Sequence, residues 1–324
     1  MAYMLCFVGI DVSKNVLDVH LKPQAQRRQF ANDAAGIAQL IEALREIVPA
    51  QIVLEPSGGY EEQCFRMLHD AGLPIQRVDA TRIRLYAFGS GKRAKTDRID
   101  AAVLARVAGA IHLDLMEPAH GKPLDTPRCR LRWAVRERER CVRERAARNV
   151  RLQKLDGDDQ LRASLERHIA WLSEEIKAYD RLIAERLKAT PEIERLSRIL
   201  QSVPGIGPIV AAVIIARLPE LGKIHRRQIA SLAGVAPVAR DSGTTSGKRR
   251  IWGGRADLRR ALSWAAVSAS RCNDDLSEYY KMKRQQGKET KVALTIVMRK
   301  LLTLLNTLVH ENREWTKRTV KAAA

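Results

Sequence analysis

Four acidic residues could together hold divalent metal ions, because each is expected where a strand ends or a helix begins. Asp11 comes at the end of the first apolar strand, and Glu55 comes at the end of a later buried strand. Asp97 and Asp100 open a helix in the segment KTDRIDA and share one of its faces, because they are three residues apart. Hard cations take oxygen ligands, and two of them about 3.5–4 Å apart stabilise the attacking and leaving oxygens of a phosphodiester displacement. We therefore expect the four carboxylates to be ligands for Mg²⁺ (or Mn²⁺) rather than general acids.

Each of these acids taken singly also fits an ordinary structural role. Asp11 can start a turn and Glu55 can be a strand-end acid. Asp97 and Asp100 suit the N-terminus of a helix that Thr96 caps. Their combination favours a functional role, because carboxylates at adjacent strand ends would point into one cleft of an otherwise basic chain.

The elements that must position these acids predict an α/β domain over the first 110 or so residues. A continuous apolar run and an alternating segment predict a β-hairpin, which a third strand near 27–30 extends. Helices and strands then alternate: a helix from Asn32 or Asp33, a strand at 52–54, a helix at 60–71 and a strand at 75–78. A sheet that begins with a hairpin and continues through βαβ crossovers is typical of a ribonuclease-H-like domain, although periodicity alone gives only the α/β class.

The remainder of the chain is expected to be helical. Residues 113–127 are rich in proline and glycine and predict a linker. From Arg128 to Lys154 the sequence has eleven basic and three acidic residues. The next helix has apolar residues at steps of 4, 3, 4, 3 and 4, namely Leu165, Ile169, Leu172, Ile176, Tyr179 and Ile183. This spacing is that of a coiled-coil seam, so residues 128–190 predict an antiparallel helical hairpin.

The charge balance predicts a polyanionic partner. Lysine and arginine number 57 against 37 acids, which gives a net charge of +20, beyond the magnitude of about 2–8 that suits solubility. Aromatic residues make up only 5%, which favours contacts to phosphates over stacking on bases. The candidate nucleic-acid ligands are Arg132, Arg136, Arg138, Arg143, Arg145, Lys248, Arg249, Arg250 and Arg255. The simpler alternative is a solvated face whose arginines pair with Glu137, Glu139 and Glu144.

Cysteine usage and hydropathy predict a cytoplasmic protein without a membrane partner. The five cysteines are scattered and never spaced as C-x-x-C, which argues against a disulfide framework and a zinc site. The apolar run 210–216 is far shorter than the roughly 20 residues of a membrane span. The first dozen residues lack the basic start and the cleavage site of a signal peptide.

Several motifs together carry a resemblance to a known family. GIDVSKN, LEPSGGY and KTDRIDA in the first part resemble the Asp-Glu-Asp-Asp signature of the DEDD transposases of bacterial insertion sequences, the IS-one-ten family related to the Piv DNA invertases. In the second part VPGIGP, GVAPVARDSG, GGRADLRRAL and YYKMKRQQGKETKVALTIVMRKLL are similar to that family's transposase domain. The motifs occur in order over nearly the full chain, so the resemblance is specific.

The resemblance implies a domain organisation and a nucleophile. It implies a RuvC-like domain at 1–112, a linker at 113–127, a basic coiled-coil hairpin at 128–190 and a helical transposase domain at 191–324. The metal ligands would be the four acids, and the nucleophile would be Ser242 of GVAPVARDSG. Without the resemblance, a serine beside glycine in a loop is far more often a turn residue. A serine hydroxyl that attacks a phosphodiester conserves the bond as a phosphoserine link, which permits rejoining to another strand.

The resemblance also implies partners. These are donor and target DNA and a structured noncoding guide RNA that pairs with them. Base pairing would then read the sequence, while the protein reads the shape of the backbone. Exchange of two duplexes needs several active sites, which predicts a homo-oligomer, a dimer or tetramer, associated with the bacterial nucleoid.

Three other classes remain as alternatives. A RuvC-like junction or structure-specific endonuclease would use the four acids and water without a covalent intermediate, but it would leave the Ser242 loop unexplained. A sugar-kinase or actin-like ATPase can begin with a similar hairpin, yet the sequence has no second phosphate loop of the D-x-G type. A non-catalytic binding protein would require the acids to be structural. The segment VPGIGP itself suits a phosphate-binding helix-hairpin-helix and a tight turn between helices about equally.

Overall fold

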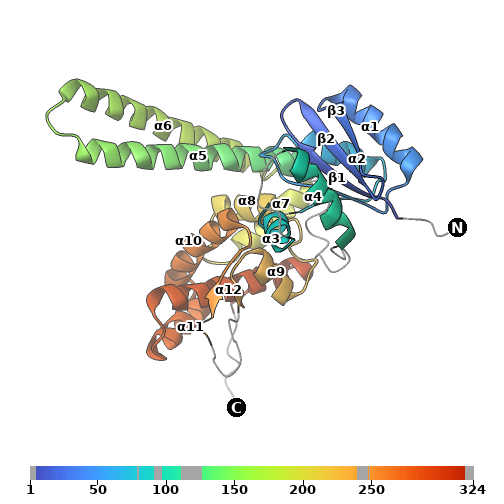
Figure 1. Cartoon of the computed structure of the whole chain (residues 1–324). Coiled ribbons are helices and arrows are strands. Elements are labelled where there is room, and N and C mark those ends of the chain that lie inside the picture. The colour runs from blue at the N-terminus through green and yellow to red at the C-terminus, as the bar shows by residue number, and fades with distance from the viewer. Residues whose placement is uncertain are drawn as a thin grey trace, which may run out of the picture. The chain divides into compact units, whose positions relative to one another are not determined.

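The computed structural model describes residues 5–78, 80–90, 97–110, 126–238, 247 and 249–317, with only the backbone for 97–100 and 126 (Figure 1). The chain divides into two compact units, Met1–Pro123 and Leu124–Ala324. The first unit is a mixed α/β domain, and the second is mainly helical. This is the division between an α/β part and a helical part that the sequence predicts.

The first unit is built on a five-stranded sheet of order β3-β2-β1-β4-β5. Its strands are β1 (Phe7–Val12), β2 (Val16–Lys22), β3 (Gln26–Ala31), β4 (Gln51–Leu54) and β5 (Ile75–Arg77). Strands β1, β2 and β3 pair antiparallel, whereas β4 pairs parallel with both β1 and β5. The hairpin start and the later crossovers predicted from the sequence are therefore confirmed.

Helices cover both faces of this sheet, and strand alternation decides which side chains meet them. Val8 and Ile10 of β1 pack in one core cluster with residues of α1 (Ala34–Ile47) and α2 (Glu62–Asp70). Phe7 of β1 and Val53 of β4 pack in a second cluster with residues of α3 (Ala80–Gly89) and α4 (Asp97–Ala110). Odd-numbered residues of β1 and β4 thus face α4.

Helix α4 lies directly against β1 at Gly9. A Cβ on Gly9 would lie 2.2 Å from the carbonyl oxygen of Ala101 and 2.3 Å from the amide nitrogen of Ala105. At the other end of the helix, a Cβ on Gly109 would lie 3.1 Å from the ring of Phe7. The helix therefore runs antiparallel to β1, and its N-terminal turn points toward the carboxyl end of that strand.

Gly9→Ala is expected to separate α4 from the sheet and to destabilise the first unit by about 3 kcal/mol, because overpacking against backbone atoms has no flexible side chain to yield. The measurement is the thermal melting of the full chain. Gly89→Ala is the matched control: a Cβ there meets nothing within 4 Å, so its effect should stay within about 0.5 kcal/mol. Equal melting temperatures for the two variants would contradict the close packing of α4.

The second unit begins with a long helical hairpin. Helices α5 (Thr126–Lys154) and α6 (Asp159–Arg186) lie side by side (Figure 1). The six apolar residues predicted as the seam of α6 are all buried or half-buried, and Leu172, Ile176 and Ile183 are fully buried. Asp158 caps α6 by accepting a hydrogen bond from the amide of Leu161, at 2.8 Å.

The rest of the second unit is a helical bundle with one short two-stranded ribbon. Its helices are α7 (Pro191–Gln201), α8 (Pro208–Arg217), α9 (Arg226–Leu232), α10 (Ala256–Cys272), α11 (Asp274–Gln285) and α12 (Thr290–His310). The ribbon pairs β6 (Pro237–Val238) with β7 (Arg250–Ile251). In the VPGIGP turn between α7 and α8, Gly205 has φ +102 and a Cβ there would lie 2.6 Å from Ala269 of α10. This close approach explains Gly205 as a packing residue.

Helix α12 is long and apolar, and it packs within the helical unit. By length and composition it is the one helix within the described residues that is long and apolar enough to cross a membrane. Lys291, Arg299 and Lys300 interrupt its apolar pattern, so the helix contains no long run of purely apolar residues. Most of its apolar side chains, Leu301 and Leu305 among them, are buried within the helical unit. The helix is therefore accounted for as a core helix of this unit.

An ion-pair network joins the hairpin to the bundle. Arg217 of α8 lies 3.8 Å from the carboxylate of Glu139 on α5 and 3.2 Å from that of Asp257 on α10. Burial lowers the pKa of the Arg217 guanidinium, while the two carboxylates oppose that shift. Burial and then the neighbouring Asp257 raise the pKa of Glu139. The network fixes the base of the hairpin on α8 and α10.

Candidate active site

Asp11 and Glu55 lie at the same edge of the sheet. In the parallel pair of β1 and β4, Ile10 is the register partner of Leu54, so the next residue of each strand is one of the two acids. Side chains two residues apart on a strand point to the same face of the sheet. Asp11 is two residues after Gly9, and Glu55 is two residues after Val53, so both acids lie on the face that α4 covers. Both acids are half-buried. The structure thus brings together two of the four acids that the sequence singled out.

The first turn of α4 carries the other two acids. The helix begins at Asp97, and its N-terminal turn points toward the carboxyl end of β1, as the packing at Gly9 and Gly109 requires. The side chains of Asp97 and Asp100 lie outside the described part of the structure. The backbone of these two residues forms the turn of α4 that points toward the edge of the sheet where Asp11 lies.

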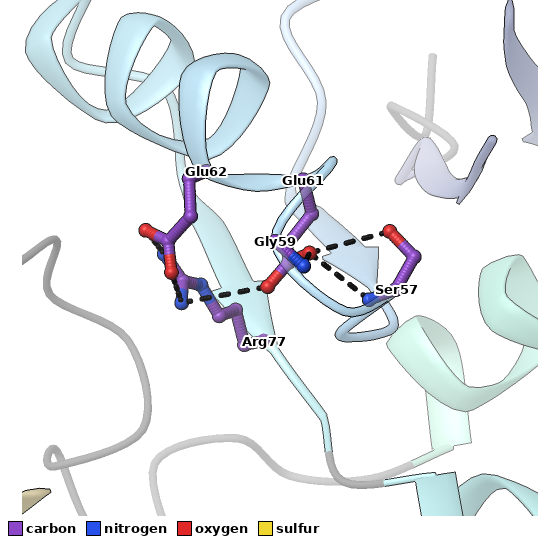
Figure 2. A network of polar contacts seen from close by, with 5 residues as sticks. All are labelled: Ser57, Gly59, Glu61, Glu62 and Arg77. Carbon is purple, nitrogen blue, oxygen red and sulfur yellow. Dashed lines mark hydrogen bonds and ion pairs between the residues drawn. The ribbon is translucent and has the colours of Figure 1, made fainter. Parts of the chain in front are cut away.

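A buried carboxylate holds the loop that follows Glu55. The Oε2 atom of Glu61 accepts hydrogen bonds from the Ser57 amide at 3.0 Å, the Ser57 hydroxyl at 3.3 Å and the Gly59 amide at 2.8 Å (Figure 2). Gly59 has φ +119, a conformation that favours glycine. Three bonds to one oxygen fix the backbone immediately after Glu55-Pro56, so Glu61 acts as a positioning residue for Glu55.

The same network continues to Arg77 at the end of β5. Its guanidinium makes two hydrogen bonds to Glu62, at 3.0 and 2.8 Å, and lies 3.9 Å from Glu61 (Figure 2). It also stacks 4.0 Å above the centre of the Phe65 ring. Glu61 and Arg77 are not among the residues that the sequence motifs single out. A pair of acids two residues after a glycine turn was the only local signal, but an exposed helix start gives the same pattern.

The loop that carries Ser242 lies outside the described residues, as does Lys248, but its two ends are described. The loop connects β6 to β7, whose register pairs Pro237 with Ile251. Behind the ribbon, a Cβ on Gly234 would lie 2.2 Å from the carbonyl oxygen of Gly253, and both glycines have positive φ. The motifs GVAP and GGRAD therefore pack together and fix both ends of the serine loop.

The arginines beside this loop differ in their surroundings. Arg255, a candidate nucleic-acid ligand, makes hydrogen bonds of 2.8 and 2.5 Å to the buried carboxylate of Glu220 and one of 2.5 Å to the carbonyl oxygen of Arg217. These contacts occupy its guanidinium and hold the end of the loop. Arg249 and Arg250 are exposed and line an open groove of the second unit.

The candidate arginines of α5 also fall into two groups. Arg138 pairs with Asp180 of α6, and Arg145 donates a hydrogen bond to the Ser173 hydroxyl at 3.2 Å. These two arginines connect the helices of the hairpin. Arg143 is exposed, Arg132 is half-buried, and Arg136 is exposed with its guanidinium 5.4 Å from the ring centroid of Trp133.

The donor set at the sheet edge suits a hard divalent cation, because carboxylate oxygens are its preferred ligands. Asp11 and Glu55 supply such oxygens from neighbouring parallel strands. Among the described side chains no three potential ligands come together. Asp97 and Asp100, which would complete a set of four, are outside that description.

Comparison with known proteins gives matches on both parts of the chain. A family profile described as a transposase matches residues 8–155, and the profile of the IS116/IS110/IS902 transposase family matches residues 197–281. The pilin gene-inverting protein of Moraxella bovis is 26% identical over 322 residues, which are 96% of this chain and 98% of the relative. The uncharacterized 42 kDa protein of insertion element IS900 from Mycobacterium paratuberculosis is 31% identical over 169 residues, 50% of this chain and 40% of the relative.

Proposed function

The chain belongs to the IS116/IS110/IS902 family of transposases, and we propose that it cuts and rejoins DNA by metal-assisted attack of Ser242. It is a DNA transposase or recombinase. The relative that spans nearly the whole chain is named for the inversion of a pilin gene, which is a recombination between DNA segments. The serine, the metal and the guide RNA are the parts of the mechanism that we add.

The observation that carries the proposal is the register of β1 and β4. It supports a RuvC-like assignment for residues 1–112, because Asp11 and Glu55 follow paired residues on adjacent parallel strands, on the face that α4 covers. Loops and helix starts at the carboxyl end of parallel strands are where α/β sheets bind their ligands. We therefore assign Asp11, Glu55, Asp97 and Asp100 as the metal ligands.

When bound to these carboxylates, Mg²⁺ or Mn²⁺ would stabilise negative charge on the attacking and leaving oxygens. The carboxylates of Asp11 and Glu55 lie at the edge of the sheet, and Glu61 keeps the backbone after Glu55 in place. Arg255 and Glu220 hold one end of the serine loop, so that Ser242 is presented from a fixed base.

In the proposed reaction, the Ser242 hydroxyl loses its proton and its Oγ forms a bond to a DNA phosphorus. The bond from that phosphorus to one deoxyribose oxygen breaks, and the leaving strand end takes up a proton as a hydroxyl. A hydroxyl of the second DNA then attacks the phosphoserine, which breaks the bond between phosphorus and Oγ and restores the serine. The number of phosphodiester bonds is unchanged, so no external energy source is needed.

We also propose the partners that this reaction requires. A net charge of +20 suits donor and target DNA together with a structured noncoding guide RNA, whose base pairing would select the sequence. A homo-oligomer, a dimer or tetramer, would supply one active site for each strand exchanged. We place the enzyme in the bacterial cytoplasm with the nucleoid, where these partners are.

A covalent protein–DNA adduct is the test of this function. We expect the full chain with guide RNA, DNA and Mg²⁺ to retain labelled DNA through denaturing electrophoresis, and Ser242→Ala to form no such adduct. Ser246→Ala, a serine four residues later in the same loop, is the matched control and should form the adduct normally. Cleavage without an adduct in the wild-type chain would identify a metal-dependent endonuclease instead.

A further inference from the structure

The second unit contains an open groove of about 1760 Å³. It is lined by residues of α9, α11 and α12, by the ribbon of β6 and β7, and by the segment 313–317 after α12. Sites for small molecules occupy about 300–1,000 Å³. The size of the groove therefore suits a segment of a polymer.

The groove is strongly basic. Ten of its lining side chains are lysine or arginine and two are acidic. One face of α12 contributes Lys291, Thr295, Arg299 and Thr303 at intervals of four residues, or about 6 Å along the helix, with the two cations exposed and the two threonines half-buried. The hydroxyls of Thr295 and Thr303 donate to the carbonyl oxygens of Lys291 and Arg299, at 2.9 Å each, so the cations are the groups of this row that can meet phosphates. Regularly spaced positive charges suit a phosphate backbone and carry no preference for base sequence.

Contacts on both sides fix the lining of this groove. The ammonium of Lys300 lies 3.8 Å from the centre of the Tyr279 ring, which joins α12 to α11. Arg195 donates a hydrogen bond of 2.7 Å to the carbonyl oxygen of Asn312. The amide of Trp315 donates one of 2.8 Å to the Ser202 hydroxyl. The segment after α12 is thus held as a border of the groove, while Lys291 and Arg299 are exposed along α12.

The groove opens at the base of the Ser242 loop. Pro237 of β6, Arg250 and Ile251 of β7, and the adjacent Arg249 line it, and these residues bound the loop that connects the two strands. The groove is therefore continuous with the described ends of the segment that carries Ser242. We propose that the groove binds one strand of DNA through its phosphates and directs it to the serine loop. This inference rests on the proposed function, because it identifies the strand by its attachment to Ser242.

The test measures binding without chemistry, in the full chain with Ser242→Ala. We expect the added pair Lys291→Gln and Arg299→Gln to lower the log–log salt slope for a single-stranded DNA by about 1.4 units, or about 0.7 for each phosphate that is no longer neutralised. This corresponds to a roughly 25-fold weaker affinity at 0.1 M salt. Arg28→Gln with Arg45→Gln removes the same charge from exposed positions of the first unit, and should leave the slope nearly unchanged.

Crosslinking identifies the location and the kind of strand. DNA that contains 4-thiothymidine should crosslink to peptides of α12 and 313–317 in the Ser242→Ala chain, and the α12 substitutions should remove that crosslink without changing the melting temperature. Crosslinking of an RNA strand but not of DNA in the groove, or an unchanged slope in the α12 variant, would overturn the inference. If the groove inference fails but the wild-type chain still forms adducts that depend on Ser242, the proposed function stands. If DNA crosslinks to the groove but the wild-type chain forms no adduct, the proposed function is rejected and binding in the groove stands.

Discussion

Asp11→Asn is expected to lower Mg²⁺-dependent DNA cleavage by more than about a hundredfold while nucleic-acid binding persists. Asparagine keeps the size of the side chain but loses the charge that holds a divalent cation, and loss of one electrostatic stabiliser of a transition state costs about 10²–10³ in rate. The cleft also becomes less repulsive to phosphate, so DNA affinity should not fall. The measurement is cleavage of labelled DNA across a Mg²⁺ titration, with binding followed in parallel.

A second readout separates metal binding from general damage. A cation that binds the folded chain raises its melting temperature, so Mg²⁺ or Mn²⁺ should stabilise the wild-type chain more than Asp11→Asn. Asp70→Asn removes an exposed carboxylate at the end of α2 and serves as the control for the change itself. Normal Mg²⁺-dependent recombination by Asp11→Asn would remove this residue from the metal site.

The sheet of the first unit follows from local sequence patterns. Leu17 to Lys22 alternates apolar and polar residues, and Asp33 is an N-cap whose side chain accepts a hydrogen bond from the Gly36 amide, at 2.8 Å. Both patterns depend on neighbours in sequence, so they can be recognised without the fold. The register that puts Ile10 beside Leu54 joins residues far apart in sequence, and no local pattern specifies it.

The positioning residues show the same limit of local patterns. Glu61 matters because its burial forces one oxygen to accept three hydrogen bonds from a loop, and burial is a property of the packed domain. Arg255 shows the reverse case. Its charge and its place beside the serine loop predict a phosphate ligand, but the buried Glu220 that binds it comes from a segment 35 residues away.

The basic groove was also inaccessible to charge counting along the chain. The arginines of α5 form a dense run in sequence, whereas the cations of the groove are separated by up to about 90 residues and meet only in the folded unit. The run on α5 is partly used within the hairpin, as the pairing of Arg138 with Asp180 shows. The proposed nucleic-acid surface therefore depends on clustering in the folded unit rather than on the density of charge along the sequence.

Ser242→Ala and Asp97→Asn chains are each expected to be inactive alone, and mixing them into one oligomer tests whether an active site is shared between two chains. The reason is that the four acids lack a protein nucleophile, while the segment that carries Ser242 has no comparable acid cluster in the sequence. If a serine from one chain serves the acids of its partner, a mixed dimer contains one site with both parts intact. In dimers purified as mixed, one of the two sites, or about half of all sites, should therefore work.

The measurement is cleavage and adduct formation after the two chains are dissociated, mixed and reassembled, with the mixed oligomers purified through two different tags. A mixture of Ser242→Ala with Ser242→Ala chains of the other tag is the control and should stay inactive. Absence of recovery in purified mixed oligomers would place the serine and the acids of each site in one chain. Full activity of the Ser242→Ala chain alone would reject the serine mechanism itself, since no phosphoserine could then form.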